Sequence, residues 1–194
     1  MILPPLILAS TSPYRRELLT RLRLAFESIA PGLPEEHLDR ESPADRSLRL
    51  ALAKAQAVAR LHPGALVIGS DQVAAVGEQL LGKPGDAAGC RAQLAILSGK
   101  TARFFTACAL LGVGAGVRLA HVDTTTVVFR ALSPAEIERY VASEQPYDCA
   151  GGFKAEGMGV ALFEGIESQD PTALIGLPLI WLAGALRGAG YHLP

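Results

Sequence analysis

Apolar and polar stretches alternate along the chain, and their lengths and periods predict a mixture of strands and helices. The runs at 6–9 and 66–70 are almost continuously apolar, which is typical of short strands covered on both faces. Patterns rich in β-branched and aromatic residues predict further strands at 101–111, 117–129 and 160–166, and a short strand could cover 26–29. Capping residues and prolines predict helices that begin near 13, 43, 86, 134 and 178 and end near 23, 61, 97, 143 and 187.

Turn residues connect these elements into a recognisable order. The segment 73–81 predicts a hairpin around Gly77-Glu78, and the glycine-rich stretch 112–116 joins two long strands as a second hairpin. No helix follows 112–116, so we do not interpret it as a dinucleotide-binding loop. The fold expected is α/β, with a twisted mixed sheet flanked by helices. We expect a single domain over residues 1–194, pinched into two lobes around a central cleft.

The charge balance excludes several classes of partner. With 18 Lys+Arg against 19 Asp+Glu and a net charge of -1, the chain has no field that would attract nucleic acid or an anionic membrane. The apolar stretch 173–186 contains Pro178 and is shorter than a membrane span. Three widely separated cysteines indicate neither a disulfide framework nor a zinc site. We therefore expect a cytoplasmic protein that binds neither nucleic acid nor membrane.

The stretch 66–72 holds the first candidate for chemistry. We expect its strand to stop at Gly69-Ser70 and to present Asp71 and Gln72, since open α/β sheets bind ligands at strand ends. The alternative is that Asp71 merely starts a turn. Other polar residues are predicted at neighbouring strand ends, helices and turns: Ser10, Arg15, Glu35 or Glu36, Lys54 and Lys83.

This set of residues suits a polyphosphate bound together with a divalent metal. Lysine and arginine neutralise phosphate oxygens, and carboxylates bind a hard cation through oxygen. Each signal is weak when taken alone, because Arg15 and Lys54 could equally be solvated helix residues and the acidic loop at 31–41 could be a solvated loop.

Several motifs together resemble the Maf family of nucleoside triphosphate pyrophosphatases. They occur in order along nearly the whole chain: LASTSPYRR at 8–16, GSDQV at 69–73, GKP at 82–84, CAGGFKAEG at 149–157 and GLPL at 176–179. The resemblance implies hydrolysis between the α and β phosphates with a divalent cation, Mg, Mn or Co. It also implies that Asp71 is the general base and that Glu35, Lys54 and Lys83 complete the site.

The physical interpretation of these residues agrees with that implication. Asp71 could orient the attacking water and accept its proton, and a metal bound by Glu35 and Asp71 would polarise the phosphate. Arg15, Lys54 and Lys83 would offset the charge that builds on the leaving pyrophosphate, with Ser10 among the phosphate-binding groups.

Three positions carry base preference within the family. Tyr14, Gln72 and Glu156 are similar to the subgroup that acts on 7-methyl-GTP, whereas the subgroup that acts on dTTP and UTP tends to have arginine, threonine and glutamine. The 7-methylguanine ring is cationic, so Tyr14 can stack on it, and Glu156 can accept hydrogen bonds from its N–H groups. The alternatives are that Tyr14 packs on its own helix and that Glu156 is a solvated charge.

Two departures from the family pattern leave details open. Pro34-Glu35-Glu36 stands where an Asp-Glu pair is usual, so either Glu35 or Glu36 could face Asp71, and Gly152 stands where serine is common. Two other functions remain open: a pyrophosphatase that prefers dTTP or UTP, and a nucleotide-sensing protein that inhibits septum formation. The long hairpin and the C-terminal helix could supply a homodimer face.

Overall fold

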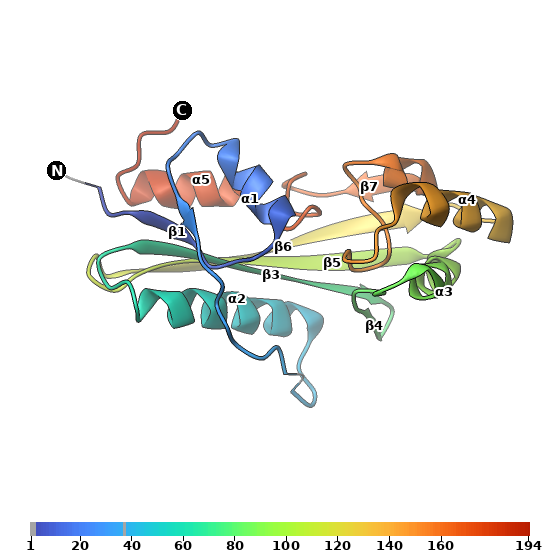
Figure 1. Ribbon diagram of the computed structural model, residues 1–194, viewed down its shortest axis with the longest axis horizontal. Coiled ribbons are helices and arrows are strands. Elements are labelled where there is room, and N and C mark those ends of the chain that lie inside the picture. The colour runs from blue at the N-terminus through green and yellow to red at the C-terminus, as the bar shows by residue number, and fades with distance from the viewer. Residues whose placement is uncertain (1–2, 37) are drawn as a thin grey trace. The chain divides into compact units, whose positions relative to one another are not determined.

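The computed structural model describes residues 3–36 and 38–194 (Figure 1). The chain divides into two compact units. The first unit comprises Met1–Gln72, Thr106–Asp123 and Asp170–Pro194, and the second comprises Val73–Phe105 and Thr124–Gln169. The predicted central cleft stays a prediction.

Seven strands of the described residues form one sheet in the order β2-β1-β3-β5-β6-β7, with β4 paired to β3. Strand β1 is parallel to β2 and to β3, whereas β3 pairs with β4 and β6 with β7 in antiparallel register. The mixed sheet confirms the predicted α/β fold. The strands are β1 Leu6–Leu8, β2 Glu27–Ser28, β3 Leu66–Val76, β4 Gln79–Leu81, β5 Thr101–Gly112, β6 Val117–Phe129 and β7 Phe163–Glu167.

The helices begin where the capping residues predict. Side chains of Ser12, Ser42 and Asp86 accept hydrogen bonds from backbone amides in the first turn of α1, α2 and α3, and Ser133 and Glu136 form a capping box at α4. The helices are α1 Pro13–Thr20, α2 Pro43–Ala59, α3 Ala87–Leu97, α4 Pro134–Glu144 and α5 Leu179–Gly188. Within the described chain no helix has the length and apolar character needed to cross a membrane.

Several element ends differ from the predictions. Helix α1 ends at Thr20 and not at Arg23, because residues 21–23 form a turn in which Arg23 has a positive φ of 54°. The strand predicted at 160–166 begins only at Phe163, since Met158–Leu162 form a 3₁₀ helix before it.

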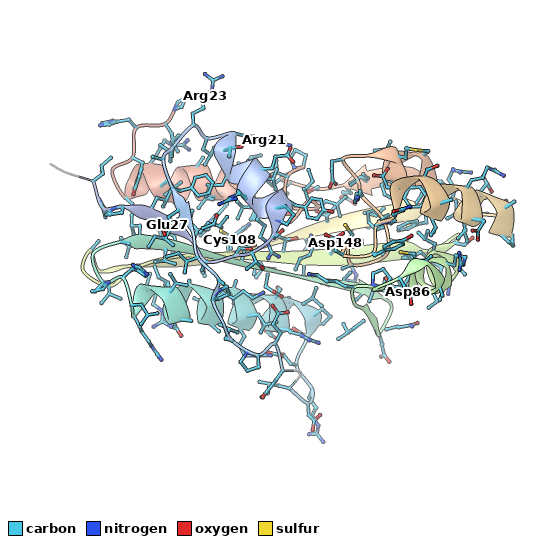
Figure 2. All side chains as sticks on the ribbon, in the orientation of Figure 1. Arg21, Arg23, Glu27, Asp86, Cys108 and Asp148 are labelled. Atoms are coloured by element: carbon cyan, nitrogen blue, oxygen red, sulfur yellow. The ribbon has the colours of Figure 1, made fainter. Side chains whose placement is uncertain are left out.

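Helices cover both faces of the first unit's part of the sheet (Figure 1). Strand residues alternate between the faces: Leu6, Leu8 and Ile68 pack with α1 and α5, whereas Ile7 and Val67 pack with α2. Figure 2 shows Cys108 of β5 between the sheet and α1, in agreement with its place in the first of these clusters. Burial on both faces explains why β1 and the start of β3 are continuously apolar.

Strand β3 corrects the prediction that the chain leaves the sheet at Gly69-Ser70. It continues through Asp71 and Gln72 to Val76, so Asp71 lies within a strand and neither follows one nor starts a turn. Glycine is present at 69 for another reason: a Cβ atom there would overlap the backbone carbonyl oxygen of Ala51 in α2. The absence of a side chain lets α2 pack directly against β3.

The second unit is held by an aromatic cluster and by two packed helices. Phe153 lies edge-to-face against Phe104, Phe129 and Phe163, with ring centroids 5.1–5.4 Å apart. Helices α3 and α4 pack together. Val76 pairs with Gln79 around Gly77, which has φ +58°, so the predicted hairpin at 73–81 is confirmed.

Candidate functional site

An ion-pair cluster lies where β3 and α2 touch, with Asp71 and Lys54 buried and Glu35 exposed. Asp71 and Lys54 are 5% and 6% exposed, and the Lys54 Nζ atom lies 2.6 Å from Asp71 Oδ1. The same Nζ atom lies 2.5 Å from Glu35 Oε1. One ammonium group therefore bridges two carboxylates that are far apart in sequence.

The close packing of α2 on Gly69 positions this lysine. Ala51 and Ala55 contact the position of the missing Cβ, and Lys54 belongs to the same turn of the helix. Leu48 and Leu52 of α2 are partly buried against the apolar cluster on this face of the sheet, whereas Lys54 is buried. An apolar pattern does not find a buried lysine, because its burial depends on partners from other segments.

Glu35 and Glu36 are distinguished by their contacts. Both side chains are exposed, but the Glu35 carboxylate contacts Lys54, whereas the Glu36 backbone carbonyl accepts a hydrogen bond from Arg49 at 3.0 Å. The geometry therefore favours Glu35 as the second carboxylate of the site, and its chemical role stays a prediction.

Burial dominates the electrostatics of Asp71. It raises the pKa of the carboxyl above its ordinary value, and the positive charges of Lys54 and Arg15 oppose the shift without cancelling it. Burial likewise lowers the pKa of Arg15, against the attraction of Asp71 and Glu35. An aspartate with a raised pKa is a better proton acceptor than one fully stabilised by ion pairs.

Arg15 and Ser10 are arranged by the short connection from β1 to α1. The Ser10 Oγ atom accepts a hydrogen bond from the Ser12 backbone amide at 3.1 Å, and Ser12 caps the helix that carries Arg15. The Arg15 Nε–H group donates to the carbonyl oxygen of Gly176 at 2.9 Å. Backbone amides at a helix N-terminus together with an arginine form a suitable phosphate site.

Gln72 follows Asp71 in β3, and the amide nitrogen of its side chain is already engaged. It donates to the carbonyl oxygens of Ala173 and Leu174 at 3.1 and 3.0 Å, and it lies 2.9 Å from Thr106 Oγ1. Contact with a base would therefore use its carbonyl oxygen. Tyr14 is half-buried in the first turn of α1. The base-reading roles of Tyr14 and Gln72 stay predictions.

Lys83 and Glu156 belong to the second unit, and both are exposed. Lys83 follows β4 in a turn where the Gly82 carbonyl accepts a hydrogen bond from Gln93 at 2.9 Å. The loop of Glu156 is attached to α4, because Tyr140 and Glu144 accept hydrogen bonds from the backbone amides of residues 154 and 158. The predicted contributions of Lys83 and Glu156 to the site stay predictions.

The carboxylates suit a hard divalent cation that shares its ligands with a substrate. Among residues 3–36 and 38–194 no group of three or more His, Cys, Asp or Glu side chains could hold a metal by itself. Asp71 and Glu35 nevertheless offer oxygen ligands close together, and Mg²⁺ is commonly bound by one or two carboxylates plus phosphate oxygens and water. Since Lys54 and Arg15 only balance these two carboxylates, a triphosphate would need further positive charge.

Some site groups were missed by sequence reasoning. Ser70 is fully buried, and its Oγ atom lies 2.8 Å from the carbonyl oxygens of Ala107 and Gly176. Thr106 donates to the Ala173 carbonyl at 2.9 Å. The available signal was a hydroxyl within an otherwise apolar strand, since such a group needs a buried partner.

Comparisons with known proteins find matches that cover nearly the whole chain or all of it. The family described as "Maf-like protein" matches residues 5–189. The chain is 55% identical over 193 residues, 100% of both chains, to the 7-methyl-GTP pyrophosphatase of Xanthomonas oryzae pv. oryzae. It is 53% identical over 189 residues to the 7-methyl-GTP pyrophosphatase of Cupriavidus metallidurans, covering 97% of this chain and 94% of that relative.

A solved structure shares the fold at low sequence identity. The Staphylococcus aureus Ham1 protein superposes with a TM-score of 0.55 over 95% of this chain and 98% of that chain, at 15% identity. This similarity supports the α/β architecture.

Proposed function

Because this chain belongs to the Maf-like protein family, we propose that it is a nucleoside triphosphate pyrophosphatase that hydrolyses 7-methyl-GTP to the monophosphate and pyrophosphate. Full-length relatives that carry this activity in their names are 53–55% identical to it. The structural observation that carries the proposal is the buried Asp71 carboxylate, whose Oδ1 atom lies 2.6 Å from the Lys54 Nζ atom.

In the proposed reaction Asp71 orients a water molecule for attack on phosphorus and accepts its proton. The raised pKa of Asp71 fits this role, because a carboxylate of higher pKa binds the transferred proton more readily. Burial fixes the side chain in one position, so little reorganisation is needed during the reaction.

Lys54, Arg15 and Ser10 act on the phosphates. The two cations stabilise negative charge as it moves onto the leaving pyrophosphate, and Ser10 and the start of α1 add dipoles directed at anionic oxygens. We assign Lys83 to the same task. An Mg²⁺, Mn²⁺ or Co²⁺ ion held by Asp71 and Glu35 would, when bound, polarise the phosphoryl oxygens.

Tyr14, Gln72 and Glu156 are the proposed base-reading residues. An aromatic face stacks on a cationic ring with a gain of about 0.5 to 2 kcal/mol, and a carboxylate accepts hydrogen bonds from guanine N–H groups, which uracil and thymine cannot match in the same geometry. The enzyme would act on the nucleotide pool of the cytoplasm. We propose the nucleotide and a second copy of the chain, in a homodimer, as its partners.

The function is tested by pyrophosphate release from 7-methyl-GTP, GTP, UTP and dTTP, each with Mg²⁺, Mn²⁺ or Co²⁺. We expect 7-methyl-GTP to be turned over with the highest kcat/KM. Preference for UTP or dTTP would contradict the substrate assignment, and nucleotide binding without release would favour a sensor.

Asp71→Asn tests the general base. We expect turnover to fall by about 10²- to 10⁴-fold, as is usual for loss of a general base, while circular dichroism shows an intact fold. Asp45→Asn is the matched control, because Asp45 lies in the first turn of α2 and is not assigned to the site. Unchanged turnover in Asp71→Asn would remove Asp71 from the chemistry.

Glu156→Gln tests the base preference. It should lower kcat/KM for 7-methyl-GTP more than for UTP. Glutamine keeps the size of the side chain but lacks the negative charge that attracts the cationic ring. Steady-state kinetics on both substrates measure the ratio. Equal losses would mean that Glu156 does not read the base.

A further inference from the structure

Residues 170–177, here called the Asp170 loop, connect to α5 through an internal hydrogen-bond network. The Asp170 side chain is buried. Its Oδ1 atom accepts hydrogen bonds from the backbone amide of Thr172 at 2.9 Å and from the Thr172 hydroxyl at 2.6 Å. Its Oδ2 atom accepts from the Ile180 amide at 2.6 Å. Asp170 therefore caps α5 from ten residues upstream, where Pro178 makes no side-chain cap.

Thr172 is the second fixed point of the loop. Its Oγ1 atom accepts a hydrogen bond from the Leu179 amide at 2.9 Å and lies 2.8 Å from the Leu177 carbonyl oxygen. The hydroxyl proton can serve either Asp170 or Leu177. These contacts join the two ends of the loop and fix the backbone between them.

The fixed backbone presents its carbonyl oxygens to the candidate site. Gly176 accepts from Arg15 Nε at 2.9 Å, and its oxygen lies 2.8 Å from Ser70 Oγ. Ala173 and Leu174 accept from Gln72. Gly176 has φ +127°, and a Cβ atom there would lie 3.4 Å from Arg15 Nε. This backbone conformation favours glycine, and it directs the carbonyl to the guanidinium.

We propose that Asp170 and Thr172 are positioning residues, which act on the reaction by holding the Gly176 carbonyl against Arg15. The guanidinium is planar, so engagement of Nε by a fixed acceptor sets the orientation of its two terminal amino groups. Those two groups are the ones that would bind phosphate oxygens as a pair. The inference rests on the proposed pyrophosphatase function, since it assigns a purpose to the orientation of Arg15.

Thr172→Val removes the hydroxyl while keeping the size of the side chain. We expect kcat/KM for 7-methyl-GTP to fall about tenfold or more, because small displacements of a charge-stabilising group are costly. Thr172→Ser restores the hydroxyl and should restore activity. Thr20→Val is the matched control: it makes the same chemical change in α1, the helix of Arg15, where Thr20 Oγ1 donates to the Glu17 carbonyl. Its kinetics should match those of the wild type.

A readout independent of turnover separates positioning from simple stabilisation. In ¹⁵N-arginine-labelled protein, the Arg15 Nε–H signal is identified by its loss in Arg15→Lys. We expect its hydrogen exchange to accelerate in Thr172→Val and to stay unchanged in Thr172→Ser and Thr20→Val. If Thr172→Val does not fold, Asp170→Asn serves as the second variant, with the same expected change.

The kinetics of the double variant complete the test. Lysine lacks the Nε–H donor, so Thr172→Val should have no further effect on kcat/KM in an Arg15→Lys background. Additive effects, or an unchanged Arg15 signal, would overturn the proposal. Wild-type protein that releases no pyrophosphate from any triphosphate would instead overturn the proposed function, and the hydrogen-exchange comparison would still decide whether the loop holds Arg15.

Discussion

At Gly69 the packing of β3 on α2 depends on the absence of one carbon atom. The backbone of α2 occupies the space that a Cβ would need, and Lys54 lies in the same turn of the helix as this contact. The distance from Lys54 to Asp71 is therefore coupled to the residue at position 69. A buried ion pair is sensitive to such displacement, because each charge loses its compensation as the other moves away.

Gly69→Ala tests this coupling. We expect the free energy of unfolding to fall by about 1–3 kcal/mol, as is typical of overpacked positions, and pyrophosphate release to fall with it as Lys54 shifts. Urea unfolding and steady-state kinetics measure the two effects. Gly64→Ala is the control, since a Cβ there meets nothing within 4 Å. A fully stable and active Gly69→Ala variant would show that α2 can move without affecting the site.

Helix α4 begins with a capping box, in which Ser133 and Glu136 bind each other's backbone amides. The Glu136 carboxylate accepts hydrogen bonds from the Ser133 backbone amide at 2.8 Å and from the Ser133 hydroxyl at 2.7 Å. The Ser133 backbone contact, followed by the Ser133 hydroxyl and Arg130, lowers the pKa of Glu136 to about 2. Tyr140 and Glu144 of this helix anchor the loop that carries Glu156. The capping box therefore supports the predicted base-reading residue through the element that holds its loop.

Glu136→Gln has an effect on stability that depends on pH. Because folding lowers the pKa of Glu136 from 4.5 to about 2, the ionised carboxylate stabilises the folded state above pH 4.5. This contribution is lost as the pH falls from 4.5 towards 2. The difference in unfolding free energy between wild type and Glu136→Gln should therefore be largest near neutral pH and shrink across that window. Glu164→Gln, at an exposed position of β7, is the control, and a pH-independent difference would contradict the assignment.

For the whole molecule, stability comes mainly from apolar packing. Two hydrophobic clusters cover opposite faces of the sheet in the first unit, and four phenylalanines pack together in the second. The positive charges of Lys54 and Arg15 balance the negative charges of Asp71 and Glu35 without a metal. The protein should therefore fold before any metal binds.

Removal of divalent metal should abolish activity and leave the fold unchanged. With EDTA we expect pyrophosphate release to stop and the midpoint of thermal unfolding, recorded without nucleotide, to stay the same. Activity should return on addition of Mg²⁺, Mn²⁺ or Co²⁺. A large fall in the unfolding midpoint would mean that the metal is structural, and turnover in EDTA would mean that the metal is dispensable.

The sequence by itself determined the elements and most of the candidate residues. Caps such as Ser12 and Ser133 act on amides three residues away, and apolar runs indicate burial without reference to partners, so both can be recognised from local sequence. The motifs around Asp71 indicate the family from the sequence alone. Local pattern failed at Gly69, where the cause of the glycine is a helix from another part of the chain.

Only the tertiary structure decided how the polar groups pair. Lys54 and Asp71 are 17 residues apart, Ser70 and Gly176 are 106 apart, and Arg15 and Gly176 are 161 apart. No periodicity reports contacts at such separations, because they form when strands and helices pack and buried polar groups must find partners. For the same reason the structure, and not the sequence, distinguished Glu35 from Glu36 and showed that Asp71 lies within a strand.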